Sequence, residues 1–308
     1  MSNNVFTFRI YLPSLEKYAY FKELKSVQYL TLCKLIQNDD NKPVDDLFTN
    51  IIRESIDNTD IIPLLTRIDK FCILLNIRIM SISDTLELSF KPSGSDEKLN
   101  IKCDLYDVLD KVTNFKFEYN KLVQVSDKYS IGTSIPNTLT DLENTNILND
   151  SLCSIRINDK IYDLTEYDTE SKNKVIDSLS SGVLSQLNRS LKTSNDEYNI
   201  EILSYDNPNT AVPASQNKYT LQLYNNSIFE FTKLIFNGNI EEQYYLRYIL
   251  AKRLHFQVDY IDNKSPIDLT TYINFYKKEL ADEKKAADKQ NRQNSMNLPP
   301  QNFGGGVA

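Results

Sequence analysis

The chain has 308 residues, of which 41% are hydrophobic and 25% charged, and these values are normal for a globular protein with a buried core and argue against wholesale disorder. The net charge of -7 argues against a protein dedicated to duplex nucleic acid, which would gather lysine and arginine on one face. No apolar run approaches the length that crosses a bilayer, and Met1–Asn4 lacks the features of a signal peptide, so we expect no membrane span and a cytoplasmic location.

The N-terminal part predicts one strand followed by three helices. Alternation over residues 6–12 favours a strand, and Pro13 ends it. Pro43 fits the first turn of the second helix. The helical spacing of apolar residues covers segments 22–36, 43–56 and 61–80. In the third helix, four charged side chains are expected to remain near water, namely Arg67, Asp69, Lys70 and Arg78.

The middle of the chain is predicted to be rich in strands. Residues 86–90 and 99–103 alternate on either side of Pro92–Ser95, which predicts a hairpin, and Asp104 can cap a short helix after it. A second hairpin is predicted around the polar tip Asn158-Asp159. The expected strands are residues 115–119, 122–125, 129–135, 154–157, 160–164, 200–205 and 219–224, and a loop over residues 207–216 is expected between the last two.

One helix is expected within this middle part, over residues 167–191. Its apolar face is supplied by Val175, Leu179, Val183 and Leu187. Gly182 weakens the centre of this helix, because glycine loses more conformational freedom on folding than other residues.

Residues 225–280 contain three successive helical patterns and the clearest helix start in the chain. In Ser265-Pro266-Ile267-Asp268, a hydroxyl stands at the N-cap, proline at the first helical position and an acid at the third. Residues 281–292 are charged and helix-prone, and residues 294–308 are polar with terminal glycines. This composition is typical of a frayed helix followed by a disordered tail.

These patterns predict an α+β fold, in which a helical N-terminal unit precedes a strand-rich middle, a helical C-terminal region and a disordered tail. We place the N-terminal region, with its three helices and a hairpin, at residues 1–125. A mixed α/β middle region covers residues 126–216, the helical C-terminal region residues 217–285, and the tail residues 286–308.

The sequence contains none of the common catalytic or metal-binding spacings. It has one histidine, and its four cysteines form no CxxC pair, so four reduced, buried thiols are favoured over a zinc site. The glycines form no GxGxxG or P-loop spacing. Carboxylate pairs such as Asp45-Asp46 and Glu241-Glu242 fit helix starts, where they complement the helix dipole. We therefore expect no catalytic residue, cofactor, metal or small-molecule substrate.

The 19 tyrosines and 14 phenylalanines allow two interpretations. An aromatic platform for nucleic acid would need interleaved lysine or arginine, and no such excess is present. A protein interface is favoured instead, because tyrosine combines an apolar body with a polar tip. Two tyrosine pairs each lie one helical turn apart and are either partner-binding or core residues. These candidate partner-binding residues are Tyr244 with Tyr248, and Tyr272 with Tyr276.

Several segments carry a resemblance to a known family. In the N-terminal part these are Leu12-Pro13-Ser14, Leu30-Thr31, Ile51–Asp57 and Leu74–Ile79. In the C-terminal part they are Leu223–Phe231, Tyr248–Lys252 and Tyr272–Asn274. Over residues 5–285 the chain resembles the baseplate protein family of T4-like contractile-tailed bacteriophages, and its C-terminal stretch resembles the hub-assembly members. The resemblance implies a baseplate hub or hub-assembly protein without enzymatic activity.

The resemblance also implies partners and a location. The partners would be other phage baseplate hub or tail proteins, and the location would be the cytoplasm of the infected bacterial host or the baseplate of the virion tail. A tail assembly chaperone that is absent from the finished virion is the alternative, because the helices around Leu246–Tyr276 also resemble short segments of tail chaperones. A hydrolase or transferase is a third hypothesis.

Overall fold

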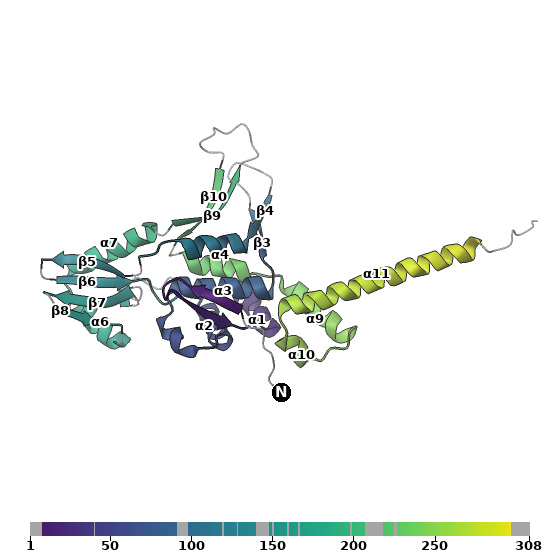
Figure 1. Cartoon of the computed structure of the whole chain (residues 1–308), viewed down its shortest axis with the longest axis horizontal. Coiled ribbons are helices and arrows are strands. Elements are labelled where there is room, and N and C mark those ends of the chain that lie inside the picture. Colours follow the sequence, from purple (N-terminus) through teal and green to yellow (C-terminus); the bar gives the residue numbers. More distant parts are fainter. Residues whose placement is uncertain are drawn as a thin grey trace, which may run out of the picture.

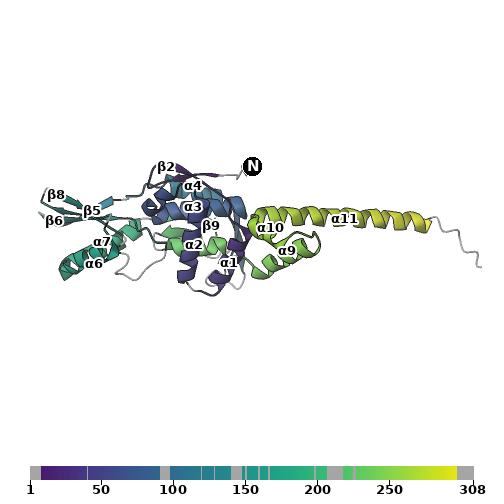
Figure 2. The ribbon, with the colours of Figure 1, turned by 90° about the horizontal axis from the view of Figure 1, so that it is seen from below.

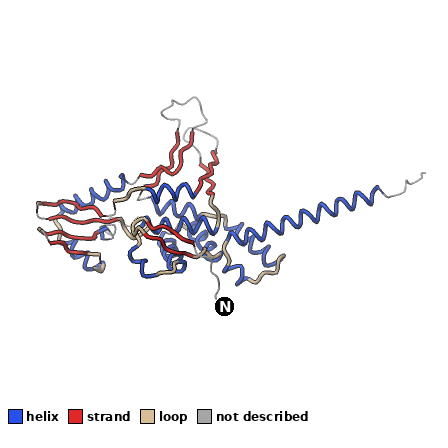
Figure 3. The backbone as a smooth tube through the Cα atoms, in the orientation of Figure 1, coloured by secondary structure: helices blue, strands red, loops and turns tan. Residues whose placement is uncertain are grey.

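The computed structural model describes residues 8–296, apart from residues 40, 91–97, 119, 128, 140–147, 150, 159, 166, 198, 207–217, 225 and 226. Helices and antiparallel strands are mixed along the chain, which confirms the expected α+β class. Figure 1 shows an elongated molecule with a central body, a strand-rich lobe at one end and a long helix, α11 (Pro266–Met296), projecting from the other. Figure 3 shows that the segment packed beside the start of this helix, residues 240–263, is also mainly helical.

An antiparallel hairpin begins the described chain. It consists of β1 (Phe8–Leu12), which the sequence predicts, and β2 (Lys17–Phe21), which it does not. Ile10 and Leu12 of β1 point into the core and are almost fully buried. The strand β2 escapes prediction because it is short and its outward face is aromatic, so that apolar and polar positions do not alternate clearly. The outward-facing residues of the hairpin are Arg9, Tyr11, Tyr18 and Tyr20.

The first two predicted helices are confirmed. They are α1 (Ser26–Gln37) and α2 (Asn41–Ser55), and Pro43 lies in the first turn of α2 as expected. The chain that follows α2 contacts the end of β2, because Phe21 forms a β-bridge with Ile56.

The third predicted helix, residues 61–80, is wrong as a single element. The segment forms a 3-10 helix, η1 (Thr59–Leu64), and a separate α-helix, α3 (Arg67–Ser81). The Oγ1 atom of Thr66 accepts a hydrogen bond from the amide of Asp69 at 3.3 Å, and the Asp69 carboxylate accepts one from the amide of Thr66 at 2.9 Å. This reciprocal capping box starts a new helix shortly after Pro63.

Three of the four charged side chains expected near water are buried instead. Arg67, Asp69 and Arg78 have exposed fractions of 2%, 0% and 7%. Arg67 Nε donates to the carbonyl of Thr138 at 2.6 Å, and Arg78 Nε donates to the carbonyl of Ile235 at 2.7 Å. Because these bonds replace water, the charged groups are tolerated inside. The expectation was wrong because helical spacing does not show partners from distant parts of the chain.

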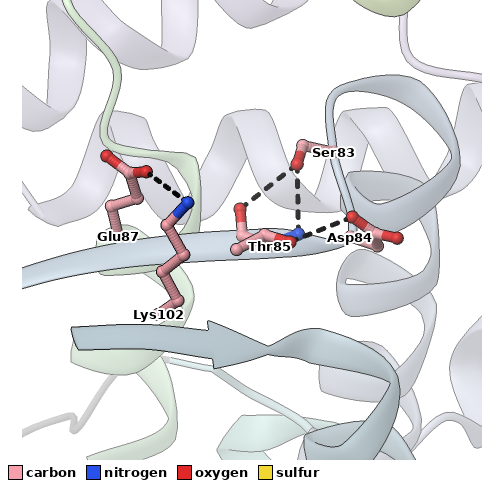
Figure 4. Close-up of polar contacts among 5 residues, drawn as sticks. All are labelled: Ser83, Asp84, Thr85, Glu87 and Lys102. Carbon is pink, nitrogen blue, oxygen red and sulfur yellow. Dashed lines mark hydrogen bonds and ion pairs between the residues drawn. The ribbon is translucent and has the colours of Figure 1, made fainter.

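The hairpin after α3 is confirmed. It consists of β3 (Thr85–Phe90) and β4 (Leu99–Asp104), and Asp104 caps the following helix, α4 (Leu105–Asn114), by accepting from the amide of Tyr106 at 2.8 Å. Figure 4 shows the turn into β3, where the Ser83 hydroxyl accepts from the Thr85 amide at 3.0 Å. It also shows Lys102 paired with Glu87 across the hairpin at 3.5 Å.

A four-stranded antiparallel sheet forms the strand-rich lobe. Its strands, in spatial order, are β5 (Asn120–Ser126), β6 (Tyr129–Ser134), β7 (Leu152–Ile157) and β8 (Lys160–Asp163). The helices α6 (Thr169–Asp177) and α7 (Ser181–Glu197) lie together on one face of this sheet (Figure 2). The strand predicted at residues 115–119 is wrong. Residues 115–118 form a loop in which the rings of Phe115 and Phe117 lie 4.8 Å apart, and residue 119 lies outside the described residues.

The single helix predicted at residues 167–191 is also wrong, because α6 and α7 are separated by a break. Asp168 caps α6 by accepting from the amide of Ser171 at 2.7 Å. Ser180 starts α7, since its Oγ accepts from the amide of Val183 at 3.4 Å. Gly182 therefore lies in the first turn of α7 and not at the centre of a long helix.

The chain then returns to the central body. The strands β9 (Asn199–Asp206) and β10 (Lys218–Tyr224) form where strands are predicted, and they pair with each other. The predicted loop at residues 207–216 lies outside the described residues, and α8 (Ile228–Phe236) follows β10. Side chains of β9, β10 and α8 join the same buried cluster as those of α1 to α4. A second cluster lies between the four-stranded sheet and its helices. The division of the chain at residues 125, 216 and 285 stays a prediction.

Three helices complete the described chain: α9 (Ile240–Lys252), α10 (Val258–Asn263) and α11. The short α10 is missing from the three predicted helical patterns. Ser265 Oγ accepts from the amide of Asp268 at 3.4 Å, and α11 begins at Pro266 as predicted. α11 extends to Met296, so residues 286–296 of the predicted tail are helical. Residues 297–308 lie outside the described residues.

Candidate partner-binding surface

The helices α9, α10 and α11, residues 240–296, form a helical module with its own apolar cluster. Leu250 of α9, Ile261 of α10 and two residues of α11, Leu269 and Ile273, are its buried members. The cluster joins all three helices, so that each of them has a defined position relative to the other two.

Polar contacts fix this module to α1 in the central body. The amide of Ser26, the first residue of α1, donates to the carbonyl of Lys264 at 2.7 Å. Arg247 of α9 donates to the Ser26 hydroxyl at 3.2 Å and forms an ion pair with Asp262. Burial lowers the pKa of the Arg247 guanidinium from its ordinary value, which is the cost of removing a charge from water. These contacts hold α9 against the central body.

The first tyrosine pair is exposed on α9. Tyr244 and Tyr248 have exposed fractions of 49% and 56%, and Lys34 Nζ lies 5.2 Å from the centre of the Tyr244 ring. The neighbouring Tyr245 is 65% exposed. Since the opposite side of α9 packs through Leu250, these three rings are not needed for the apolar cluster of the module. They form the candidate partner-binding surface, which we call the tyrosine surface.

The second tyrosine pair has a different environment. Tyr272 is half-buried, and its hydroxyl oxygen lies 3.2 Å from that of Tyr260 in α10. The ring of Phe256 lies 5.2 Å from that of Tyr272. The hydrogen bond with Tyr260 raises the pKa of Tyr272. Tyr272 therefore contributes to packing within the module, and its partner in the pair, Tyr276, is half-buried on the same helix.

Several exposed apolar residues of the module are missing from the candidates predicted by spacing. Among them are Tyr245 on α9 and, on α11, Phe275 and Leu280, with exposed fractions of 65%, 65% and 45%. Pairing tyrosines one turn apart overlooks them. The signal that could have found them is that apolar residues occur on more than one side of each helix, so that one side must face water or a partner.

The four cysteines are free thiols, of which Cys33, Cys72 and Cys103 are buried and Cys153 is half-buried. Burial raises the pKa of each thiol. All four are thus mainly protonated near neutral pH, and a protonated thiol is a poor nucleophile. Within the described part of the chain, no group of three or more His, Cys, Asp or Glu side chains is placed to hold a metal ion.

Among the residues that the structure describes, no helix is both long and apolar enough to cross a bilayer.

Comparison with known proteins gives a match to a family model. The family is described as T4 bacteriophage base plate protein, and the matched residues are 4–220. This range covers the N-terminal hairpin, the strand-rich lobe and the first part of β10, and it ends before α8 and the helical module. No curated protein and no solved structure matches the chain.

Proposed function

This chain belongs to the family of T4 bacteriophage base plate proteins, and we propose that it acts in assembly of the baseplate hub, through contacts with other hub or tail proteins and without enzymatic activity. Family membership supports a structural or assembly role in the phage baseplate. The assignment to the hub rests on the resemblance of the C-terminal stretch to hub-assembly members.

The tyrosine surface is the observation that carries this proposal. Tyr244, Tyr245 and Tyr248 expose about half or more of their side chains on one short helix. Tyrosine is enriched at protein interfaces, because it buries a large rigid surface and still offers a hydroxyl for hydrogen bonds. Adjacent exposed aromatic rings on a folded protein favour a surface that contacts a partner over one that faces only water.

The position of the module supports access by a partner. Figure 1 shows α9, α10 and α11 at the end of the molecule opposite the strand-rich lobe. The contacts of Arg247 with Ser26 and Asp262 hold α9 in place. A prearranged surface loses less conformational entropy when it binds than a flexible one.

A binding experiment tests the surface directly. Purified hub proteins of the same phage are measured against the wild-type chain and against Tyr244→Ala/Tyr248→Ala. We expect the double variant to weaken binding to its hub partner by at least about 30-fold, which corresponds to about 2 kcal/mol. Tyr167→Ala is the matched control, because Tyr167 is 47% exposed and lies just before α6 in the chain. Equal loss in the control, or no loss in the double variant, contradicts the proposal.

A genetic experiment tests the assembly role. Disruption of the gene should produce infected cells with assembled heads but without complete baseplates. Electron microscopy of the lysate provides the readout, and normal tails in such an infection would rule out a role in baseplate assembly.

Mass spectrometry of purified particles distinguishes a permanent baseplate component from an assembly factor that leaves the virion. We expect the protein to act in the cytoplasm of the infected host and to remain in the tail baseplate, so its peptides should be present in stoichiometric amounts. Complete absence of these peptides would favour the tail assembly chaperone instead.

A further inference from the structure

A groove with a volume of about 410 Å³ lies between the N-terminal hairpin and α4. None of the residues that line it belongs to the tyrosine surface. One wall is formed by β1, with Arg9 and Tyr11, and by Tyr18 of β2. The other wall is one face of α4, with Tyr106 and Asp110. Both walls stand beside α3, and Figure 1 shows α4, α3 and the purple hairpin next to one another in the central body.

The groove follows the open edge of a β-sheet. Among the described residues, β1 pairs only with β2, in a two-stranded sheet. The last residues of β2 already have a partner on their outer edge, because the amide of Asp57 donates to the carbonyl of Tyr20 at 3.1 Å and Phe21 bridges Ile56. Beside the groove, the outer edge of β1 is the edge at which a further strand can pair. Open strand edges present unpaired N–H and C=O groups to any extended chain that fits beside them.

The groove lining carries two opposite charges, Asp110 on α4 and Arg9 on β1, so the strand edge itself carries the positive one. The guanidinium carbon of Arg9 lies 3.7 Å from the centre of the Tyr18 ring, and Arg9 forms no ion pair with a described residue. The ring of Tyr11 lies 5.1 Å from that of Tyr18. Stacking holds the planar guanidinium in one orientation while leaving its N–H groups available, and these groups fit a carboxylate in a bidentate manner.

We propose that this groove binds an extended peptide segment of a partner protein, which pairs with β1 as a third strand and places an acidic side chain on Arg9. The open strand edge explains why the occupant is an extended chain and not a compact small molecule, since a row of backbone groups has to be matched. The charge of Arg9 explains why the segment carries an acid. Tyrosine rings on both walls give apolar contact to the side chains beside it.

This inference does not depend on the hub role, because it concerns a separate surface and a general class of partner. Its test therefore uses no phage protein. A displayed library of random linear 12-residue peptides serves as the probe for the purified full-length chain. Selected peptides are synthesised, and their affinities are measured for the wild type, for Arg9→Glu and for a matched control, Arg53→Glu. Arg53 is an exposed arginine of α2 that lies outside the groove lining.

We expect the selected peptides to share an acidic position and to bind Arg9→Glu at least about tenfold more weakly than the wild type, with no change for Arg53→Glu. Amide hydrogen exchange of the wild-type chain provides a second readout that needs no variant. Binding of the peptide should slow exchange in residues 8–12, because β1 gains strand hydrogen bonds.

Several results would overturn the proposal. They are recovery of no binding peptide, equal binding to wild type and Arg9→Glu, and slowed exchange confined to segments outside β1. In the absence of peptide, protection of the β1 amides should not depend on protein concentration. An increase with concentration would identify a second copy of this chain as the occupant, and it would also overturn the proposal.

Discussion

The Nε atom of Arg78 donates a 2.7 Å hydrogen bond to the main-chain carbonyl of Ile235, so a single side chain of α3 holds the last turn of α8. The last carbonyls of a helix have no partner within that helix, and a cation at this end also complements the helix dipole. A second guanidinium N–H of Arg78 donates to the carbonyl of Ser83, at the turn into β3. Arg78 thus joins three elements of the central body.

Replacing this side chain should destabilise the fold. Arg78→Met keeps the apolar stem but leaves the carbonyls of Ile235 and Ser83 without a donor in a buried site. We expect the free energy of unfolding to fall by about 3 kcal/mol, measured by urea denaturation. Arg53→Met, at an exposed arginine, is the control and should change it by less than about 0.5 kcal/mol. A loss no larger than that of the control would show that Arg78 is not a tie between these elements.

Gly238, between α8 and α9, should not tolerate a side chain. A β-carbon at this position would overlap the hydroxyl of Tyr29 and lie 3.1 Å from Cys33 Sγ. We expect Gly238→Ala to lower the free energy of unfolding by about 2 kcal/mol, and this loss should shrink in a Tyr29→Phe background. Gly182→Ala is the matched control. Its β-carbon would meet only Ser180 Oγ at 4.0 Å, so the change should be neutral or stabilising.

Alkaline pH should weaken the fold through Tyr29. Burial raises the pKa of Tyr29 well above its ordinary value of 10. As pH rises above about 10, Tyr29 loses its proton in the unfolded chain but keeps it in the folded one, so stability falls with rising pH. In urea denaturation from about pH 9 to about pH 11, we expect Tyr29→Phe to lose stability less steeply than the wild type. Parallel profiles of the two proteins would contradict this prediction.

The two tyrosine pairs should differ in their effect on stability. Tyr244→Ala/Tyr248→Ala removes exposed rings and should change the free energy of unfolding by less than about 1 kcal/mol. Tyr272→Ala removes a ring that packs on Phe256 and bonds Tyr260, so it should lower that free energy by about 3 kcal/mol. Thermal denaturation followed by circular dichroism provides the comparison. Equal melting temperatures for the two variants would mean that Tyr272 is not a packing residue.

Local patterns in the sequence predict most of the helices and strands but not where some helices break. The apolar period continues across Pro63, although Thr66 and Asp69 carry a capping signature that starts a new helix there. Likewise, Ser180 caps α7 within a stretch that reads as one helix. In both segments the correct boundary is present in the sequence as a cap. The longer apolar period hides it.

Burial depends on residues that are far apart in the sequence, and helical spacing does not contain this information. Arg67 can be buried because its guanidinium donates to the carbonyl of Thr138, which lies 71 residues away in the sequence. For the candidate site, spacing correctly places Tyr244 and Tyr248 on one side of α9, but it cannot show whether that side faces water. Tyr272 meets the unpredicted helix α10, which is why its pair has a different environment.

The length of α11 also affects how the protein will behave as a particle in solution. Its 31 residues rise 1.5 Å each and therefore extend over about 46 Å. An object of this shape experiences more friction than a sphere of equal mass. In gel filtration a monomer of 35.6 kDa will therefore elute ahead of a compact standard of that mass and resemble an oligomer. Light scattering, which reports mass independently of shape, is the appropriate measure of its subunit number.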